Sequence, residues 1–193
     1  MSTLPKRLLT HEDYLAIERE ADFKSEYYRG KMFAMAGASE THTLIISNVV
    51  RSLGNQLLNR DCNIYSSQMR VKVSKLKKYT YPDIVVTCGK ETFEDDQADT
   101  LVNPVLIIEV LSESTEAYDR GKKFEHYQYL ESLSEYLLIS QEAYRIEQYV
   151  RQSDRTWTYY EFRDLDDVVK LATIGCELAF KDVYLKIAME SAA

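Results

Sequence analysis

The spacing of hydrophobic residues predicts two long helices. Over residues 41–60 apolar side chains recur every three or four positions, which places them on one side of a helix. These side chains are Leu44, Ile45, Val49, Leu53, Leu57 and Leu58. Residues 113–131 predict the second helix, because Phe124, Tyr127 and Leu130 are spaced to share one face.

A shorter helix is expected over residues 10–20. Thr10 is a favoured N-cap residue, and Glu12 and Asp13 place acidic side chains in the first turn. The residues expected to face inward are Tyr14, Leu15 and Ile17.

Alternating or continuous apolar runs predict strands along most of the remaining chain. Residues 26–28 and 31–36 predict a hairpin around the turn Arg29-Gly30-Lys31. The other expected strands lie at 63–73, within 81–89 and 104–115, and at 135–140, 144–150 and 156–162. Basic residues 75–78 are expected in a loop, an acidic loop spans 89–103, and residues 168–187 show no clear period.

This order of elements predicts an α/β or α+β fold with a central mixed β-sheet flanked by helices. The length of 193 residues fits a single domain over 1–193. The composition, 45% hydrophobic and 28% charged, is that of an ordinary globular protein.

The cysteines and the termini indicate a cytoplasmic protein. Cys62, Cys88 and Cys176 form no metal-binding or redox motif, so we expect three reduced, buried thiols. The N-terminal residues contain no apolar run typical of a signal peptide, and no segment is long and apolar enough to span a membrane.

The charge is uneven along the chain. A net charge of −7 argues mildly against nucleic-acid binding, which usually involves a basic protein. Residues 70–82 are nevertheless basic without an acid, and residues 91–99 are acidic without a base. The basic stretch is either a phosphate-binding patch or, like the acidic one, a solvated loop.

Asp83 and Glu109 are carboxylates on otherwise apolar strands. A buried carboxylate must be paired, metal-bound or protonated. If the two strands pair antiparallel with Thr87 opposite Val105, then Asp83 faces Glu109, with the Cβ atoms roughly 5 Å apart. Two such acids with a backbone carbonyl or water suit Mg²⁺.

Two alternatives to this metal site remain open. Asp83 could cap its strand while Glu109 pairs with a buried lysine or arginine. The facing arrangement also depends on the assumed register, because a slip of one residue turns a side chain to the other face of the sheet.

A metal-dependent hydrolase also needs a group that orients a water and balances developing charge. Leu111 occupies the position two residues after Glu109, so no lysine follows on the strand. In the predicted helix, Lys123 shares a stripe with Arg120 and Tyr127, and its long stem could bring the ammonium back to the carboxylates. The alternative is a surface lysine.

Two further polar residues favour structural roles. His42 lies at the start of a predicted helix, where a cap-proximal or core histidine is favoured over a catalytic one. Gln68 precedes Asp83 and could reach the site, but a glutamine on the face of the sheet is the favoured interpretation.

Together these motifs resemble the PD-(D/E)XK nuclease superfamily, and more closely the bacterial Uma-type family of restriction-endonuclease-like proteins. The resemblance runs in order through nearly the whole chain. Its pieces are EYYRGKMFAMAG at 26–37, His42, PDIVV at 82–86, IEVLSEST at 108–115, DRGKKFEHY at 119–127 and EYLLI at 135–139.

The resemblance implies a restriction-endonuclease-like fold and Mg²⁺- or Mn²⁺-dependent hydrolysis of DNA phosphodiester bonds. It implies that Asp83 and Glu109, with the Val110 carbonyl, bind the metal. Glu26 would match the family's early acid, and Lys123 would be the catalytic lysine moved from the strand to the helix. The expected phosphate contacts are Lys72, Lys75, Lys77 and Lys78.

A different class of function remains open, namely a nuclease-like fold without turnover that binds nucleic acid or protein. The acidic pI of about 5.1 and Leu111 favour this alternative slightly. The surplus of tyrosines, 15 in all, and the strands near the C-terminus favour a homodimer as a further partner.

Overall fold

The computed structural model describes residues 8–189. The expectation about a signal peptide falls in part on residues 1–7, which lie outside this range. Within the described part of the chain, no helix is long and apolar enough to cross a membrane.

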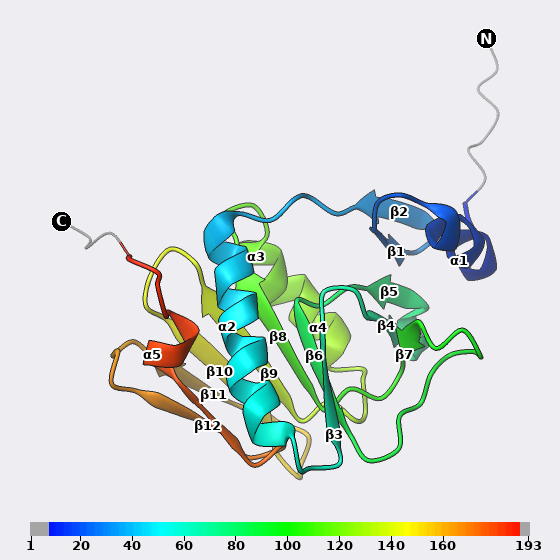
Figure 1. The fold of residues 1–193 in the computed structure, drawn as a ribbon. Helices are drawn as coiled ribbons and strands as arrows, with labels where there is room; N and C mark the ends of the chain where they lie inside the picture. Colours follow the sequence, from blue (N-terminus) through cyan, green and yellow to red (C-terminus); the bar gives the residue numbers. More distant parts are fainter. Residues whose placement is uncertain (1–7, 190–193) are drawn as a thin grey trace.

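The helices are few and the longest covers one face of a sheet (Figure 1). They are α1 (His11–Glu20), α2 (Glu40–Leu57), α3 (Glu116–Tyr118), α4 (Phe124–Tyr127) and α5 (Phe180–Val183), with a 3₁₀ turn η1 (Ser74–Leu76) and a π-helical segment η2 (Asp119–Lys123). Because α3, η2 and α4 follow one another without a break, we call residues 116–127 the lysine helix.

The largest sheet has six strands in the order β11-β10-β9-β8-β6-β3. Its strands are β3 (Cys62–Ser66), β6 (Ile84–Cys88), β8 (Leu106–Leu111), β9 (Glu135–Ser140), β10 (Ile146–Arg151) and β11 (Trp157–Phe162). Only β8 and β9 run parallel, so the sheet is mixed, as predicted.

A second sheet has five strands in the order β2-β1-β5-β4-β7. Its strands are β1 (Ser25–Tyr28), β2 (Lys31–Ala34), β4 (Arg70–Val73), β5 (Lys78–Thr80) and β7 (Thr100–Leu101). A two-stranded sheet joins β12 (Val168–Leu171) to β13 (Cys176–Ala179) within the segment that showed no clear period in sequence.

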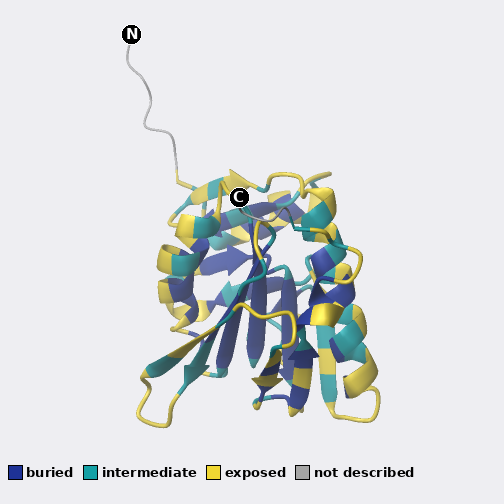
Figure 2. Ribbon diagram, turned by 90° about the vertical axis from the view of Figure 1, so that its left-hand side faces the viewer, coloured by how far each residue is buried: buried dark blue, intermediate teal, exposed yellow. Residues whose placement is uncertain are grey.

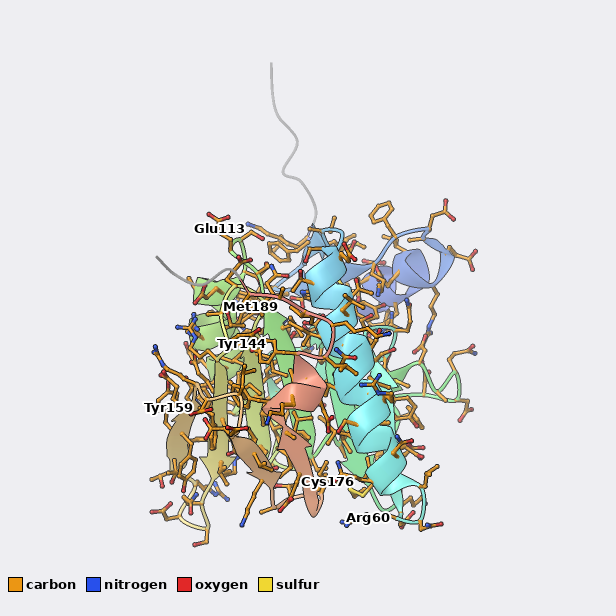
Figure 3. All side chains as sticks on the ribbon, turned by 60° about the vertical axis from the view of Figure 1, so that its left-hand side comes forward. Arg60, Glu113, Tyr144, Tyr159, Cys176 and Met189 are labelled. Carbon is orange, nitrogen blue, oxygen red and sulfur yellow. A yellow bond between two sulfur atoms is a disulfide. The ribbon has the colours of Figure 1, made fainter. Side chains whose placement is uncertain are left out.

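The central strands β6, β8 and β9 of the six-stranded sheet are buried on both faces because their neighbouring residues alternate between two cores (Figure 2). Ile108 and Val110 pack with α2, α5 and the two-stranded sheet, and Figure 3 shows Cys176 at the start of β13 beside α2. Ile107 and Leu111 pack on the other side with the lysine helix and strand β4. Glu109 lies between Ile108 and Val110, so it faces the lysine helix.

Both N-terminal helix predictions are confirmed. Helix α2 lies within the predicted range but for its first residue, and α1 begins after Thr10, whose side chain accepts from the Asp13 amide in a capping box. The inward position of Ile17 is wrong, because this side chain is exposed. Glu18 is buried in its place and accepts hydrogen bonds from the Ser25 amide and the Tyr81 hydroxyl.

Three element predictions need correction. The strand predicted over 63–73 is two strands, β3 and β4, which belong to different sheets because the chain turns at residues 67–69. The helix predicted over 113–131 begins at Glu116 and ends at Tyr127, with a π-helical segment in its middle. The loop expected at 75–78 ends at Lys77, because Lys78 already begins β5.

The prediction of three reduced thiols is wrong. Cys62 and Cys88 occupy opposite positions of β3 and β6 and form a disulfide, whereas Cys176 is free and buried. Cysteines 26 positions apart in sequence become neighbours only through the pairing register of the two strands, which the spacing alone does not reveal.

Candidate active site

The predicted pairing register of β6 and β8 is confirmed. The two strands are antiparallel with Ile84 opposite Ile108 and Val86 opposite Leu106. The next position outward in the same register places Asp83 opposite Glu109, and the Asp83 amide lies 3.4 Å from Glu109 Oε2. The two carboxylates therefore meet where β6 begins and β8 approaches its end.

Asp83 is held by both of its oxygens. Its Oδ2 accepts a 2.8 Å hydrogen bond from the Val110 amide, and its Oδ1 lies 3.0 Å from Nε2 of His42. His42 is in the first turn of α2, where its amide donates to the N-cap Ser39. The favoured interpretation of His42 as a cap-proximal residue is therefore right about its backbone, but its ring belongs to the site.

Glu109 is buried and shares one oxygen between two donors. The Tyr127 hydroxyl donates to Oε1 at 2.8 Å, and the Lys123 ammonium lies 2.9 Å from the same atom. Burial raises the pKa of Glu109 to about 8, against the lowering effect of Lys123, and the Asp83 charge adds to the rise. Burial is therefore the main reason why the Glu109 carboxyl holds its proton more tightly than an exposed glutamate does.

Lys123 lies where the sequence placed it, inside the protein with its ammonium among carboxylates. Besides Glu109, its Nζ is 3.2 Å from Asp119 Oδ1 and 4.0 Å from Glu26 Oε1. Burial lowers the pKa of Lys123, but these carboxylates outweigh that effect and raise the pKa well above its ordinary value. Lys123 is therefore a fixed positive charge in the site.

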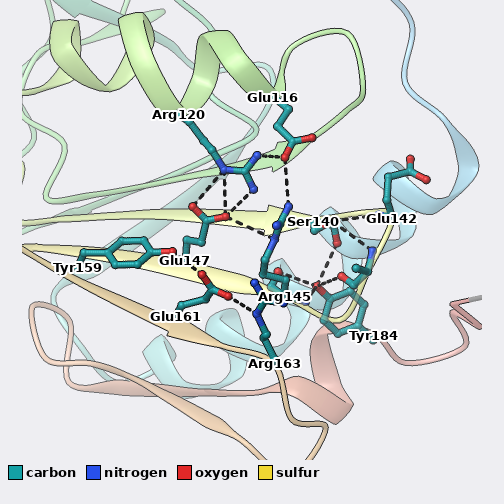
Figure 4. Close-up of polar contacts among 11 residues, drawn as sticks. Glu116, Arg120, Ser140, Glu142, Arg145, Glu147, Tyr159, Glu161, Arg163 and Tyr184 are labelled. Atoms are coloured by element: carbon teal, nitrogen blue, oxygen red, sulfur yellow. Dashed lines mark hydrogen bonds and ion pairs between the residues drawn. The ribbon is translucent and has the colours of Figure 1, made fainter. Parts of the chain in front are cut away.

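Ion pairs between the lysine helix and strand β10 hold the helix against the six-stranded sheet. The Arg120 guanidinium donates to the buried Glu147 of β10 from both Nε and Nη2, and it also pairs with Glu116 (Figure 4). Arg145 contacts Glu116 as well, at 3.1 Å. Because Arg120 and Lys123 lie on the same π-helical segment, this network fixes the position from which Lys123 reaches Glu109.

Glu26 is held from strand β5 by two residues that face the same way. The Thr80 hydroxyl donates to Glu26 Oε1, and Lys78 Nζ lies 3.7 Å from Oε2. Lys78 also donates to the Tyr118 hydroxyl at 2.6 Å and lies 3.4 Å from Nδ1 of His126. Glu26 therefore joins the two lysines of the site.

Lys78 was expected to contact phosphate, but its side chain is only 1% exposed. It is the first residue of the buried strand β5 rather than part of a basic loop, and burial lowers its pKa. The spacing of Lys78 and Thr80, two residues apart, places both on one face of a strand, but it does not indicate that this face is buried.

The other predicted phosphate contacts differ in their surroundings. Lys72 pairs with Glu94 at 2.5 Å, and Lys75 pairs with Glu131 at 2.7 Å. Lys77 forms no ion pair within residues 8–189 and lies at a turn with a left-handed backbone, φ 47°. Gln68 sits in the turn between β3 and β4, and no described contact joins it to the carboxylates.

The oxygen atoms of the site fit a hard divalent cation. The candidate ligands are the carboxylates of Asp83 and Glu109 and the carbonyl of Val110, and Mg²⁺ prefers such oxygens while keeping several waters. Across residues 8–189, no group of three or more histidine, cysteine, aspartate or glutamate side chains is arranged to bind a metal. A cation bound by Asp83 and Glu109 would take its remaining ligands from backbone and water oxygens.

This geometry can be compared with known proteins. The Uma2 family model, described as "Putative restriction endonuclease", matches residues 11–181. The chain belongs to the Uma2 family. Two relatives come from Synechocystis sp. (strain ATCC 27184 / PCC 6803 / Kazusa). "Uncharacterized protein sll1609" is 37% identical over 155 residues, covering 80% of this chain and 88% of the relative. "Uncharacterized protein slr1290" is 35% identical over 180 residues, covering 93% of each.

A solved structure shares the fold. It is the crystal structure of "a putative nuclease belonging to DUF820" from Anabaena variabilis ATCC 29413, with a TM-score of 0.77. The match covers 93% of this chain and 99% of that one at 20% sequence identity. The predicted restriction-endonuclease-like fold and the resemblance to the Uma family are thereby confirmed.

Proposed function

We propose that this Uma2 protein is a Mg²⁺-dependent endonuclease that hydrolyses DNA phosphodiester bonds. Membership of a family of restriction-endonuclease-like nucleases supports the reaction class. The observation that carries the proposal is the convergence of Asp83, Glu109 and Lys123 from two strands and a helix. Lys123 Nζ lies 2.9 Å from Glu109 Oε1, and the backbone amide of Asp83 lies 3.4 Å from the other oxygen of Glu109.

Asp83, Glu109 and the Val110 carbonyl would bind Mg²⁺ or Mn²⁺. A bound divalent ion supplies Lewis-acid polarisation of a phosphoryl oxygen and lowers the pKa of a bound water. The protein contributes a rigid set of oxygens, because the Val110 amide and His42 fix Asp83 and Tyr127 fixes Glu109.

Lys123 would orient the attacking water and balance the charge that develops on the phosphate. Preorganised positive charge in a water-poor site is usually a large term in such catalysis. The restriction-endonuclease-like lysine normally follows the strand glutamate by two positions, where this chain has the buried Leu111. The lysine helix replaces that strand lysine, since it delivers an ammonium to the same carboxylate.

Glu26 would be a positioning residue in this scheme. It lies between Lys123 and Lys78, and its hydrogen bond from Thr80 fixes one oxygen. A carboxylate between two ammonium groups keeps both at defined positions.

The polymer substrate would be held by cations near the site. Within residues 8–189 Lys77 forms no ion pair, whereas Lys72 and Lys75 would have to exchange Glu94 and Glu131 for phosphate. Counterion release from DNA favours such exchanges at low salt.

One observation favours a second candidate function, a nuclease-like fold that binds nucleic acid without turnover. Lys123 occupies Glu109 Oε1, an oxygen that a metal could use, and Leu111 fills the position of the usual strand lysine. In this alternative the ion pair is a structural substitute for the metal.

Plasmid nicking separates the two functions. Wild-type protein is incubated with supercoiled DNA and Mg²⁺, Mn²⁺ or EDTA, beside Asp83→Ala and Glu109→Ala. The endonuclease proposal expects nicking that requires metal and is lost in both variants. Full activity in the variants overturns the site assignment, and DNA binding without any cleavage by the wild type establishes the second function.

A further inference from the structure

One face of the β1–β2 hairpin borders the candidate active site. Glu26 lies opposite Phe33 and Tyr28 lies opposite Lys31 in the antiparallel register. Opposite residues of a strand pair project from the same face. Phe33 and Lys31 therefore project from the face on which Glu26 meets Lys78.

That face carries exposed aromatic rings on two sides of Glu26. Phe33, on the edge strand β2, is 51% exposed. Across the site, Tyr118 of the lysine helix is 39% exposed, and its hydroxyl accepts from Lys78, which in turn lies 3.7 Å from Glu26. The accessible rings of Phe33 and Tyr118 thus lie on two sides of Glu26.

The tip of the hairpin is basic, and acidic side chains within residues 8–189 do not neutralise it through ion pairs. Arg29 and Lys31 flank Gly30, and neither forms an ion pair within residues 8–189. The Arg29 guanidinium lies 5.0 Å from the centre of the Tyr28 ring. These unpaired cations contrast with Lys72 and Lys75, whose charges are matched by acids.

We propose that this surface, made of Arg29, Lys31, Phe33 and Tyr118, binds a single nucleic-acid strand and stacks an unpaired base on Phe33. The inference rests on the proposed function, whose substrate class it narrows to single-stranded DNA or the unpaired ends and flaps of a duplex. Exposed rings stack well on splayed-out bases, and basic grooves track the phosphates beside them. A closed duplex keeps its bases stacked inside and offers such a ring little to bind.

Binding is measured by fluorescence anisotropy in EDTA, with one labelled oligonucleotide used either single-stranded or annealed to its complement. The wild type is expected to bind the single strand several-fold more tightly than the duplex. Phe33→Ala is expected to raise the Kd for the single strand about 5- to 150-fold, the range produced by losing one base–aromatic stack. Its effect on duplex binding is expected to be much smaller.

Three variants make the test specific to the ring. Phe33→Tyr keeps the ring and retains binding, whereas Phe33→Leu keeps an apolar side chain and loses binding as Phe33→Ala does. Tyr160→Ala is the matched control, because Tyr160 of β11 has a similar exposure of 47% but belongs to the other sheet. Thermal unfolding of each variant establishes that it is folded.

Equal binding of single strand and duplex, with no effect of Phe33→Ala, overturns the proposal. A change of elution volume in size-exclusion chromatography on Phe33→Ala also overturns it, since the surface is then a contact between copies of this chain.

Cleavage separates the two proposals. Phe33-dependent binding without cleavage in Mg²⁺ or Mn²⁺ refutes the endonuclease and leaves the surface standing. Cleavage of both DNA forms equally by wild type and Phe33→Ala refutes the surface alone.

Discussion

Lys123 reaches Glu109 from a helix, with its Nζ 2.9 Å from Oε1 of a carboxylate buried on strand β8. The contact joins the two elements that pack on this side of the six-stranded sheet. Because Lys123 comes from the helix, the strand position two after Glu109 is free to hold Leu111, which packs into the core with Phe124. The site therefore combines an ion pair with an uninterrupted apolar core.

Breaking this ion pair on one side is expected to destabilise the protein. In Lys123→Met, Glu109 loses its ion pair and keeps the Tyr127 hydroxyl as its strong partner, and breaking a buried ion pair by removing one partner costs about 3–5 kcal/mol. Adding Glu109→Gln removes the second charge, so the double variant should regain much of the lost stability. Urea unfolding of the wild type, both single variants and the double variant measures this coupling. Additive losses would contradict it.

Lys78 is expected to act on catalysis and not on DNA affinity, because it is buried against Glu26. Lys78→Met should lower the nicking rate roughly 10- to 100-fold, as loss of a residue that orients a catalytic group does. DNA binding in EDTA should be unchanged.

Lys77→Met is the matched control for Lys78→Met. The Lys77 side chain lies outside the site, next to Lys78 in sequence, and forms no ion pair within residues 8–189. Lys77→Met should therefore weaken DNA binding at low salt without changing the nicking rate at saturating DNA. The reverse pattern, with Lys78→Met weakening binding alone, would restore Lys78 to the predicted phosphate contacts.

Asp99 is expected to make the fold acid-sensitive. Hydrogen bonds from Arg19 hold the pKa of Asp99 well below its usual range, and Thr100 and Arg70 act in the same direction. A carboxyl with a lowered folded-state pKa stabilises the protein above its unfolded pKa near 4, and this contribution disappears as the pH falls further. Because the side chain is one-third exposed, solvent screening limits the effect to about 1 kcal/mol.

The test compares the unfolding free energy of wild type and Asp99→Asn from neutral to acidic pH. The difference should be largest near neutrality and shrink below about pH 4. Asp182→Asn serves as the control, since Asp182 forms no ion pair within residues 8–189. A constant difference at all pH values would show that Asp99 acts through its shape and not its charge.

The sequence predicted the parts of the site that follow from local patterns. A symmetrical closure of the loop between two apolar strands was enough to place Asp83 opposite Glu109, and the register in the structure agrees. Helical spacing placed Lys123 on one stripe with Tyr127 but left a surface lysine open, and the family resemblance favoured a position in the site. Both spacing arguments use only the repeat of side-chain directions within one strand or helix and the place of the next element along the chain.

The missed features depend on contacts between distant segments. Lys78 looks like its basic neighbours in sequence, and only the pairing of β5 with β1 and β4 buries it. Glu18 takes the place of Ile17 because Tyr81 and Ser25 arrive as hydrogen-bond donors. The Cys62–Cys88 disulfide likewise depends on the pairing of β3 with β6. No periodicity within a single segment contains this information.

The central claim is that Asp83 and Glu109 bind a divalent ion together, and a crystal soaked in Mn²⁺ tests it most directly. The account predicts an anomalous peak between the two carboxylates, about 2.0–2.2 Å from an oxygen of each, and its loss in Asp83→Asn. A saturating soak that leaves no peak there, with the Lys123–Glu109 pair unchanged, would contradict the account.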